Sequence, residues 1–259
     1  MIDTHCHLTF PQLTDRLDEV IGAAGDAGVD RLITVGVTPD DALAAQGISH
    51  RFGNVYFTAG VHPHYIEDVP LDRFAQLVEI AADPRCVAFG EMGLDYHYPD
   101  PPRPLQRERF EAQLQLVAAC RLGKPIILHC RKAVDDTLAI LRGSSIDLNR
   151  FVFHCFTESA DDARWILDIG ASISFTGIAT YKNAPEVRAA AKLVPDDRIM
   201  VETDSPYLSP EPHRKVRPNE PKYVVDTARF IAELRGVTYE AFDELTTANA
   251  ERFFRLPER

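Results

Sequence analysis

The sequence predicts an α/β protein that forms a single (β/α)8 barrel of the TIM type over residues 1–259. Eight short apolar runs rich in β-branched residues alternate with helical stretches, as parallel strands and their crossover helices do. The length of 259 residues suits a fold that typically takes roughly 250. The sequence contains no low-complexity linker, and it lacks the Gly-rich phosphate turn that is typical of an open, doubly wound sheet.

Each predicted strand is a short apolar run bounded by turn-forming residues. The first contains the motif DTHCH at residues 3–7. The others are expected at residues 31–37, 55–61, 86–91, 125–129, 150–154, 171–175 and 198–203. The predicted helices carry apolar residues at helical spacing, as the first does through Leu13, Leu17, Val20 and Ile21. They are expected at residues 11–27, 39–51, 71–82, 105–122, 133–141, 160–167, 186–192, 221–234 and 239–254.

Composition excludes several classes of protein. No apolar run approaches the roughly 20 residues needed to cross a membrane, and the first residues are unlike a signal peptide, so we expect a cytoplasmic protein. The net charge of −11 argues against a surface that grips duplex nucleic acid along its length. Five widely spaced cysteines, an odd number, indicate reduced thiols and not a disulfide framework.

Polar side chains with metal-binding atoms fall at the ends of five predicted strands. They are His5 and His7 in the first strand, Glu91 in the fourth, His129 in the fifth, His154 in the sixth and Asp204 in the eighth. The carboxyl ends of barrel strands form the face on which active sites are built. Any one of these residues could be a helix cap or a turn former, but coincidence is a poor explanation for all six at the same end.

The types of side chain narrow the chemistry. Four histidines and two carboxylates are more than one tetrahedral metal needs, and they suit two divalent ions that share a bridging carboxylate. Zn²⁺, Mg²⁺ and Mn²⁺ are all compatible with this set of donors. A pair of such ions is typical of enzymes that hydrolyse phosphate esters.

Eight motifs extend this pattern along the chain: IDTHCHL (2–8), AGVHPH (59–64), GEMGLDY (90–96), PIILHCR (125–131), FHCFT (153–157), ISFTGI (173–178), ETDSPYL (202–208) and NEP (219–221). With these motifs in order, the sequence resembles the TatD-type metal-dependent deoxyribonuclease family, within the amidohydrolase-like barrels. Many barrels of that superfamily carry a carboxylated lysine as the bridging ligand. Here Glu91 stands at the bridging position.

The resemblance implies a first and a second divalent metal ion joined by Glu91. The implied ligands are His5, His7, Glu91 and Asp204 for the first ion, and Glu91, His129 and His154 for the second. It also implies hydrolysis of DNA phosphodiester bonds, with 3′-5′ exonuclease-like action on single strands or strand ends. Glu91 and Asp204 are the implied catalytic residues, with Asp204 as the group that accepts a proton from the attacking water. We expect DNA to be the partner and the protein to be a monomer.

Candidate substrate contacts lie on the same face. His62 and His64 follow the third predicted strand, and His62 is expected to contact phosphate. Arg131 either contacts phosphate or pairs with one of the many acidic residues. Tyr207 offers a ring on which a base can stack. Arg214 belongs to a basic stretch at residues 213–219, in which Val216 stands near a position where family members usually carry a small glycine.

Two other functions remain open. A barrel with the same metal ions could hydrolyse an amide, ester or lactone bond of a small molecule, as other members of the superfamily do. A binding protein that has lost catalysis would lack ligands, whereas all six are present here.

Overall fold

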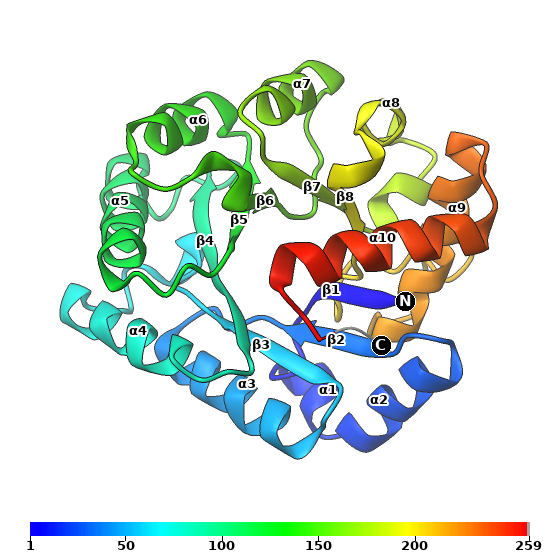
Figure 1. Cartoon of the computed structure of the whole chain (residues 1–259), viewed down its shortest axis with the longest axis horizontal. Coiled ribbons are helices and arrows are strands. Elements are labelled where there is room, and N and C mark those ends of the chain that lie inside the picture. Colours follow the sequence, from blue (N-terminus) through cyan, green and yellow to red (C-terminus); the bar gives the residue numbers. More distant parts are fainter. Residues whose placement is uncertain (258–259) are drawn as a thin grey trace.

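Eight parallel strands pair in chain order from β1 to β8 and curl into a barrel that is ringed by helices (Figure 1). The structure is a computed structural model that describes residues 1–257, so the last two residues of the predicted domain lie outside the described residues. The barrel closes where β1 meets the segment after β8. Cys6 pairs with Ser205 as an isolated parallel bridge, and the backbone N–H of Asp204 donates to the carbonyl of His5 at 2.9 Å. The predicted (β/α)8 barrel is confirmed.

The strands are short and almost wholly buried, as strands covered on both faces must be. They are β1 (Ile2–Cys6), β2 (Arg31–Thr34), β3 (Val55–Ala59), β4 (Cys86–Asp95), β5 (Ile126–Arg131), β6 (Phe151–Phe153), β7 (Ser172–Phe175) and β8 (Ile199–Val201).

The α-helices cover the outside of the barrel. They are α1 (Pro11–Thr14), α2 (Leu17–Asp26), α3 (Pro39–Arg51), α4 (Ala75–Ala81), α5 (Arg103–Cys120), α6 (Val134–Gly143), α7 (Ala160–Asp168), α8 (Pro185–Leu193), α9 (Val224–Arg235) and α10 (Tyr239–Phe254). Short 3₁₀ helices are η1 (Pro63–Tyr65), η2 (Leu71–Phe74), η3 (Leu148–Arg150), η4 (Gly177–Thr180), η5 (Asp196–Arg198) and η6 (Pro221–Tyr223). Among the described helices, none has both the length and the apolar character needed to cross a membrane.

The predicted end of the fourth strand is wrong. We expected the strand to stop at Glu91, but β4 continues to Asp95 with Met92 and Leu94 buried. Two glycines permit this, because Gly90 and Gly93 adopt φ values of +115° and +144° where the register with β5 shifts. A Cβ atom at Gly93 would lie 2.0 Å from the carbonyl oxygen of His129, so only glycine fits there.

Most predicted helices differ from the structure by one or two residues at an end, and three differ in more than their ends. The helix expected at residues 11–27 is divided into α1 and α2 by a turn at Asp15 and Arg16, which lets Leu13 and Leu17 both reach the core. The helices expected at residues 71–82 and 221–234 each begin with a 3₁₀ turn, η2 and η6. Apolar spacing does not distinguish a first turn of 3₁₀ helix from one of α-helix, because both bury the same residues.

Two apolar clusters divide the barrel along its axis. The larger cluster fills the layer between the strands and the helices. The smaller one fills the amino-terminal end of the barrel. There α10 contributes Ala250 and Phe254, and the chain just after α10 contributes Leu256. These side chains pack against strand residues such as Ile33 and Ile127. Figure 1 shows α10 lying across this end, and its contacts with β1 and β8 agree. Inside the barrel, this cluster leaves the opposite, carboxyl-terminal end for polar side chains.

Candidate metal centre

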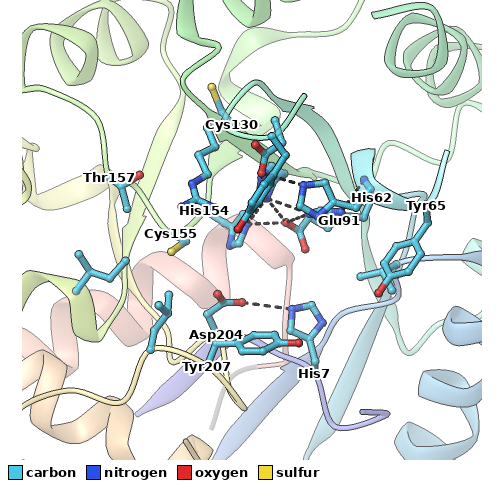
Figure 2. A pocket seen from close by; sticks show the side chains of 18 of the residues that line it. His7, His62, Tyr65, Glu91, Cys130, His154, Cys155, Thr157, Asp204 and Tyr207 are labelled. Atoms are coloured by element: carbon cyan, nitrogen blue, oxygen red, sulfur yellow. Dashed lines mark hydrogen bonds and ion pairs between the residues drawn. The ribbon is translucent and has the colours of Figure 1, made fainter. Parts of the chain in front are cut away.

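A cavity of about 910 Å³ lies at the carboxyl-terminal end of the barrel (Figure 2). Five of the six predicted metal ligands line it: His7, Glu91, His129, His154 and Asp204. The sixth, His5, is completely buried, and its ring stacks on that of His154 with the centroids 3.9 Å apart. The structure therefore brings together all six residues that sequence reasoning selected.

Glu91 lies at the middle of this cluster. Its Oε1 is 2.7 Å from Nε2 of His154 and 2.8 Å from Nδ1 of His129, while its Oε2 is 3.4 Å from Nε2 of His5. The side chain is buried, so these imidazoles replace the water that would otherwise solvate the carboxylate. A carboxylate with different neighbours on its two oxygens has the geometry of a bridging ligand.

A second group forms around Asp204. Nε2 of His7 lies 3.3 Å from Nε2 of His5 and 3.3 Å from Oδ1 of Asp204. The remaining Nδ1 atoms of both histidines are buried and have no hydrogen-bond partner among the described residues. Asp204 has φ +53°, a left-handed conformation that aspartate tolerates better than most residues, and it aims the carboxylate at the two rings.

The donor atoms fit a divalent cation. Three sets of ligand atoms each lie within 4.8 Å of one another: those of His5, Glu91 and His154, those of His5, His7 and Asp204, and those of His62, Glu91 and His129. Imidazole and carboxylate donors in threes are the usual protein contribution to a catalytic metal site. His62, which we had assigned to substrate, is therefore also a candidate ligand, since its Nε2 lies 3.2 Å from Nδ1 of His129.

Burial and neighbouring charges act on this cluster in opposite directions. Burial lowers the pKa of His5, and it lowers the pKa of His62 further. Burial acts the same way on His154, but Glu91 and Glu202 outweigh it and raise the pKa of His154 well above its ordinary value. Burial alone would raise the pKa of Glu91, yet the imidazoles outweigh it and hold that pKa well below the usual range. Glu91 is thus ionised at neutral pH, the form that binds a cation.

Two buried carboxylates behind the cluster were not found by sequence reasoning. Oδ2 of Asp95 lies 2.9 Å from Nε2 of His129, which leaves Nδ1 of that ring facing Glu91. Glu202 accepts the backbone N–H of Cys155 at 2.6 Å, and its Oε1 lies 3.4 Å from Nδ1 of His154. Carboxylates placed in this way fix the orientation of a ligating imidazole. A usable signal was present, since Asp95 follows Glu91 by four residues and so shares its side of the strand.

The cysteines beside the histidines do not join the cluster. Sγ of Cys6 donates to the carbonyl of Ile33, and Sγ of Cys155 lies 3.5 Å from Oγ1 of Thr176. Burial raises the pKa of both thiols well above its ordinary value, so neither is a thiolate. All five cysteines are free, as the sequence predicts.

Most of the predicted substrate contacts line the cavity, but Arg214 does not. His62, His64, Arg131 and Tyr207 belong to the lining. The guanidinium of Arg214 instead lies 3.5 Å from the ring centroid of Tyr181, outside the lining residues. The basic stretch is held against the segment that precedes it, because Oγ of Ser209 donates to the carbonyl of Val216.

Three aromatic side chains that line the cavity were not expected from the sequence. Phe10, Tyr65 and Tyr98 line it together with Tyr207, and the rings of Tyr65, Tyr98 and Tyr207 are 37%, 49% and 48% exposed. They lie in irregular loops and 3₁₀ turns, where sequence periodicity gives no signal. We refer to Tyr65, Tyr98 and Tyr207 as the aromatic rim.

Comparisons with known proteins agree with the fold. A family model described as TatD related DNase matches residues 2–255. The uncharacterized metal-dependent hydrolase YcfH of Escherichia coli is 40% identical over 259 residues, which cover 99% of this chain and 96% of YcfH. The 3′-5′ ssDNA/RNA exonuclease TatD of Erwinia billingiae is 37% identical over 262 residues, which cover 99% of this chain and 100% of that protein. The crystal structure of YJJV, a TatD homolog from Escherichia coli, has a TM-score of 0.91 at 28% identity and covers 99% of this chain and 98% of its own.

Replacing Glu91 by glutamine should weaken metal binding by more than about 100-fold, because a neutral amide loses the charge that four imidazoles now surround. The measurement is a metal titration of the purified protein, followed by metal content after gel filtration. Glu186→Gln, an exposed change on α8, is the matched control and should bind metal as the wild type does. Equal affinity in the two variants would show that Glu91 is not a ligand.

Replacing Asp95 by asparagine should weaken metal binding by about 10-fold to 100-fold, because the amide cannot hold His129 with Nε2 protonated and Nδ1 free. Metal affinity and the ¹⁵N chemical shifts of the His129 ring measure this together. Asp100→Asn removes the same charge from an exposed residue that lines the same cavity. If Asp100→Asn has as large an effect as Asp95→Asn, the effect is one of net charge and not of ring orientation.

Proposed function

The chain belongs to the TatD related DNase family and is a metal-dependent hydrolase, and we propose that it cleaves phosphodiester bonds at the ends of single-stranded nucleic acid, in the 3′-5′ direction. The observation that carries this proposal is the buried Glu91, which four histidine rings surround beneath a cavity rimmed by exposed aromatic residues. The Erwinia relative, named a 3′-5′ ssDNA/RNA exonuclease, supports the choice of substrate.

The cluster would hold two divalent ions of the Zn²⁺, Mg²⁺ or Mn²⁺ type. The proposed ligands are His5, His7, Glu91 and Asp204 for one ion, and Glu91, His129 and His154 for the other. When bound, such ions supply Lewis-acid activation of water and neutralise charge on phosphate oxygens.

The two catalytic carboxylates have different tasks. The side chain of Glu91 is only 3% exposed and is engaged on both oxygens, so it positions the cluster and moves no proton. The side chain of Asp204 is 15% exposed and lines the cavity, so it can reach a water molecule that attacks phosphorus. Burial acts to raise the pKa of Asp204, but His7 and His5 outweigh it and hold that pKa below its usual value. Asp204 is therefore ionised before the reaction and able to accept the proton of the attacking water.

The cavity walls offer contacts for both parts of a nucleotide strand. His62, His64 and Arg131 present nitrogen donors that suit phosphate oxygens. The aromatic rim presents rings on which unpaired bases can stack. A duplex keeps its bases stacked inside, and the net charge of −11 opposes a broad electrostatic grip on it. Both features favour a single strand that enters end first.

With metal supplied, the wild type should shorten a 5′-labelled single-stranded oligonucleotide stepwise from its 3′ end, and a chelator should abolish the reaction. Asp204→Asn should lower kcat by about 100-fold to 10,000-fold, as the loss of a general base does. Asp168→Asn, an exposed change on α7, serves as the control. No metal-dependent cleavage of DNA or RNA, together with hydrolysis of an ester, amide or lactone in a parallel assay, would favour the small-molecule alternative.

Replacing Tyr98 or Tyr207 by leucine should raise KM for single strands by about 5-fold to 150-fold, since each stacked base contributes about 1–3 kcal/mol. kcat at saturating substrate should change much less. Trp165→Leu removes an equally exposed aromatic ring from α7, away from the cavity, and should leave KM unchanged. An unchanged KM in both tyrosine variants would remove the aromatic rim from the substrate path.

A further inference from the structure

A second cavity, of about 350 Å³, lies at the end of the barrel opposite the metal centre. Its walls come from the segments that lead into β5, β6, β7 and β8 and from the last turns of α10. Figure 1 shows α10 crossing this end of the barrel. The apolar cluster that includes Phe254 and Met200 fills the barrel interior at this end, so the second cavity is separate from the metal centre.

Four arginines line this cavity: Arg150, Arg198, Arg252 and Arg255. Acidic residues outnumber basic ones in the chain by 39 to 28, so carboxylate partners are plentiful. Seven other arginines do pair with carboxylates: Arg16, Arg31, Arg51, Arg73, Arg107, Arg164 and Arg235. Among the described residues, no ion pair joins any of the four cavity arginines to a carboxylate.

Neutral oxygens satisfy only part of these guanidinium groups. Arg150 donates to the carbonyl of Lys124, and Arg198 donates to the carbonyl of Leu167 at 2.7 Å. Arg252 donates to the carbonyl of Asp197 at 2.8 Å and to Oδ1 of Asn249 at 2.6 Å. Each guanidinium carries five N–H donors in a fixed fork, so most of the donors around this cavity have no acceptor among residues 1–257.

The electrostatic cost of burying an arginine side chain without an acidic partner is clearest at Arg150. Its Nε is buried and has no hydrogen-bond partner in the described part of the chain. Burial lowers the pKa of Arg150, and the charge of Arg255 lowers it further, while Asp147 acts in the opposite direction. A buried donor without an acceptor and a pair of neighbouring like charges both destabilise the free protein, and an anion between them would relieve both.

We propose that this cavity is a binding site for a small phosphate-class oxyanion, either inorganic phosphate or the terminal phosphate of a small phosphorylated molecule. Guanidinium forks match the tetrahedral oxygens of phosphate in pairs, and four of them neutralise its two negative charges. The volume of about 350 Å³ admits a phosphate group with a small attached moiety. The proposal is independent of which bond the metal centre cleaves, because the two cavities lie at opposite ends of the barrel.

The test compares two double variants of the metal-loaded protein. Arg252→Gln/Arg255→Gln removes two exposed arginines of the cavity, and Arg142→Gln/Lys192→Gln removes the same charge from exposed residues outside it. Thermal unfolding is followed against inorganic phosphate, and separately against a nucleoside 5′-monophosphate, at constant ionic strength. Stabilisation by a ligand of the native state grows with ligand concentration relative to Kd.

The wild type and the Arg142/Lys192 control should show the same phosphate-dependent rise in Tm. The Arg252/Arg255 variant should show a smaller rise in Tm, because phosphate no longer stabilises the protein through this cavity. Phosphate should bind there at least about tenfold more weakly, since charge-assisted hydrogen bonds are lost. A response to inorganic phosphate alone identifies the free anion as the ligand, and a response to both ligands identifies a terminal phosphate. Identical Tm shifts in both double variants would overturn the proposal.

A second measurement separates this cavity from phosphate bound at the metal centre. The ¹H–¹⁵N resonance of the Arg150 side-chain Nε, assigned through Arg150→Lys, should move as phosphate is added to the metal-loaded wild type. Since this Nε is buried at the amino-terminal end of the barrel, an anion at the metal centre cannot contact it. A resonance that stays in place at phosphate concentrations that inhibit the enzyme would show that the cavity does not bind the anion.

Discussion

A buried carboxylate can persist in a protein only if charge of the opposite sign surrounds it, and Glu91 imposes this requirement on the whole barrel. Its compensating imidazoles come from β1, β5 and the segments just after β3 and β6, so these strands must hold their positions around β4 to within a hydrogen-bond length. The glycines that flank Glu91 serve the same requirement, because they allow β4 to bend and press closely against β5. The shape of the barrel and the electrostatics of the cluster therefore constrain each other.

The barrel and the six cluster residues could be predicted from the sequence because both depend on regular patterns. Buried parallel strands are continuous apolar runs, and polar residues that interrupt the pattern at strand ends meet on one face. The buried carboxylates that orient the ligand imidazoles follow no such pattern. Asp95 and Glu202 act through partners on other strands, and the sequence does not say which imidazole each will meet. The aromatic rim is set by loops, and the extension of β4 depends on two glycine φ angles that apolar spacing cannot show.

The two ends of the barrel divide its tasks. At the amino-terminal end, α10 supplies Phe254 and the chain just beyond it supplies Leu256, which complete an apolar core inside the barrel. At the carboxyl-terminal end, nine imidazole and carboxylate groups, counting His62, Asp95 and Glu202, stand close together in a structure that must tolerate their mutual desolvation. The smaller apolar cluster makes it possible to bury these polar groups together, because it holds the strands in place independently of them.

The barrel closes where β1 meets the segment after β8, and this closure has a consequence for how the cluster forms. His5 lies in β1 and His7 directly follows it, whereas Asp204 belongs to the last βα connection. The neighbouring residues Asp3 and Thr203, which bond across this junction, are 200 positions apart in the chain. No contiguous fragment that stops short of residue 204 can contain this half of the cluster. It exists only when the ring is closed, and closing the ring costs the entropy of joining so long a loop. A ligand held jointly by His7 and Asp204 would bind only the closed ring, so it would offset part of this entropy and stabilise the whole barrel against opening.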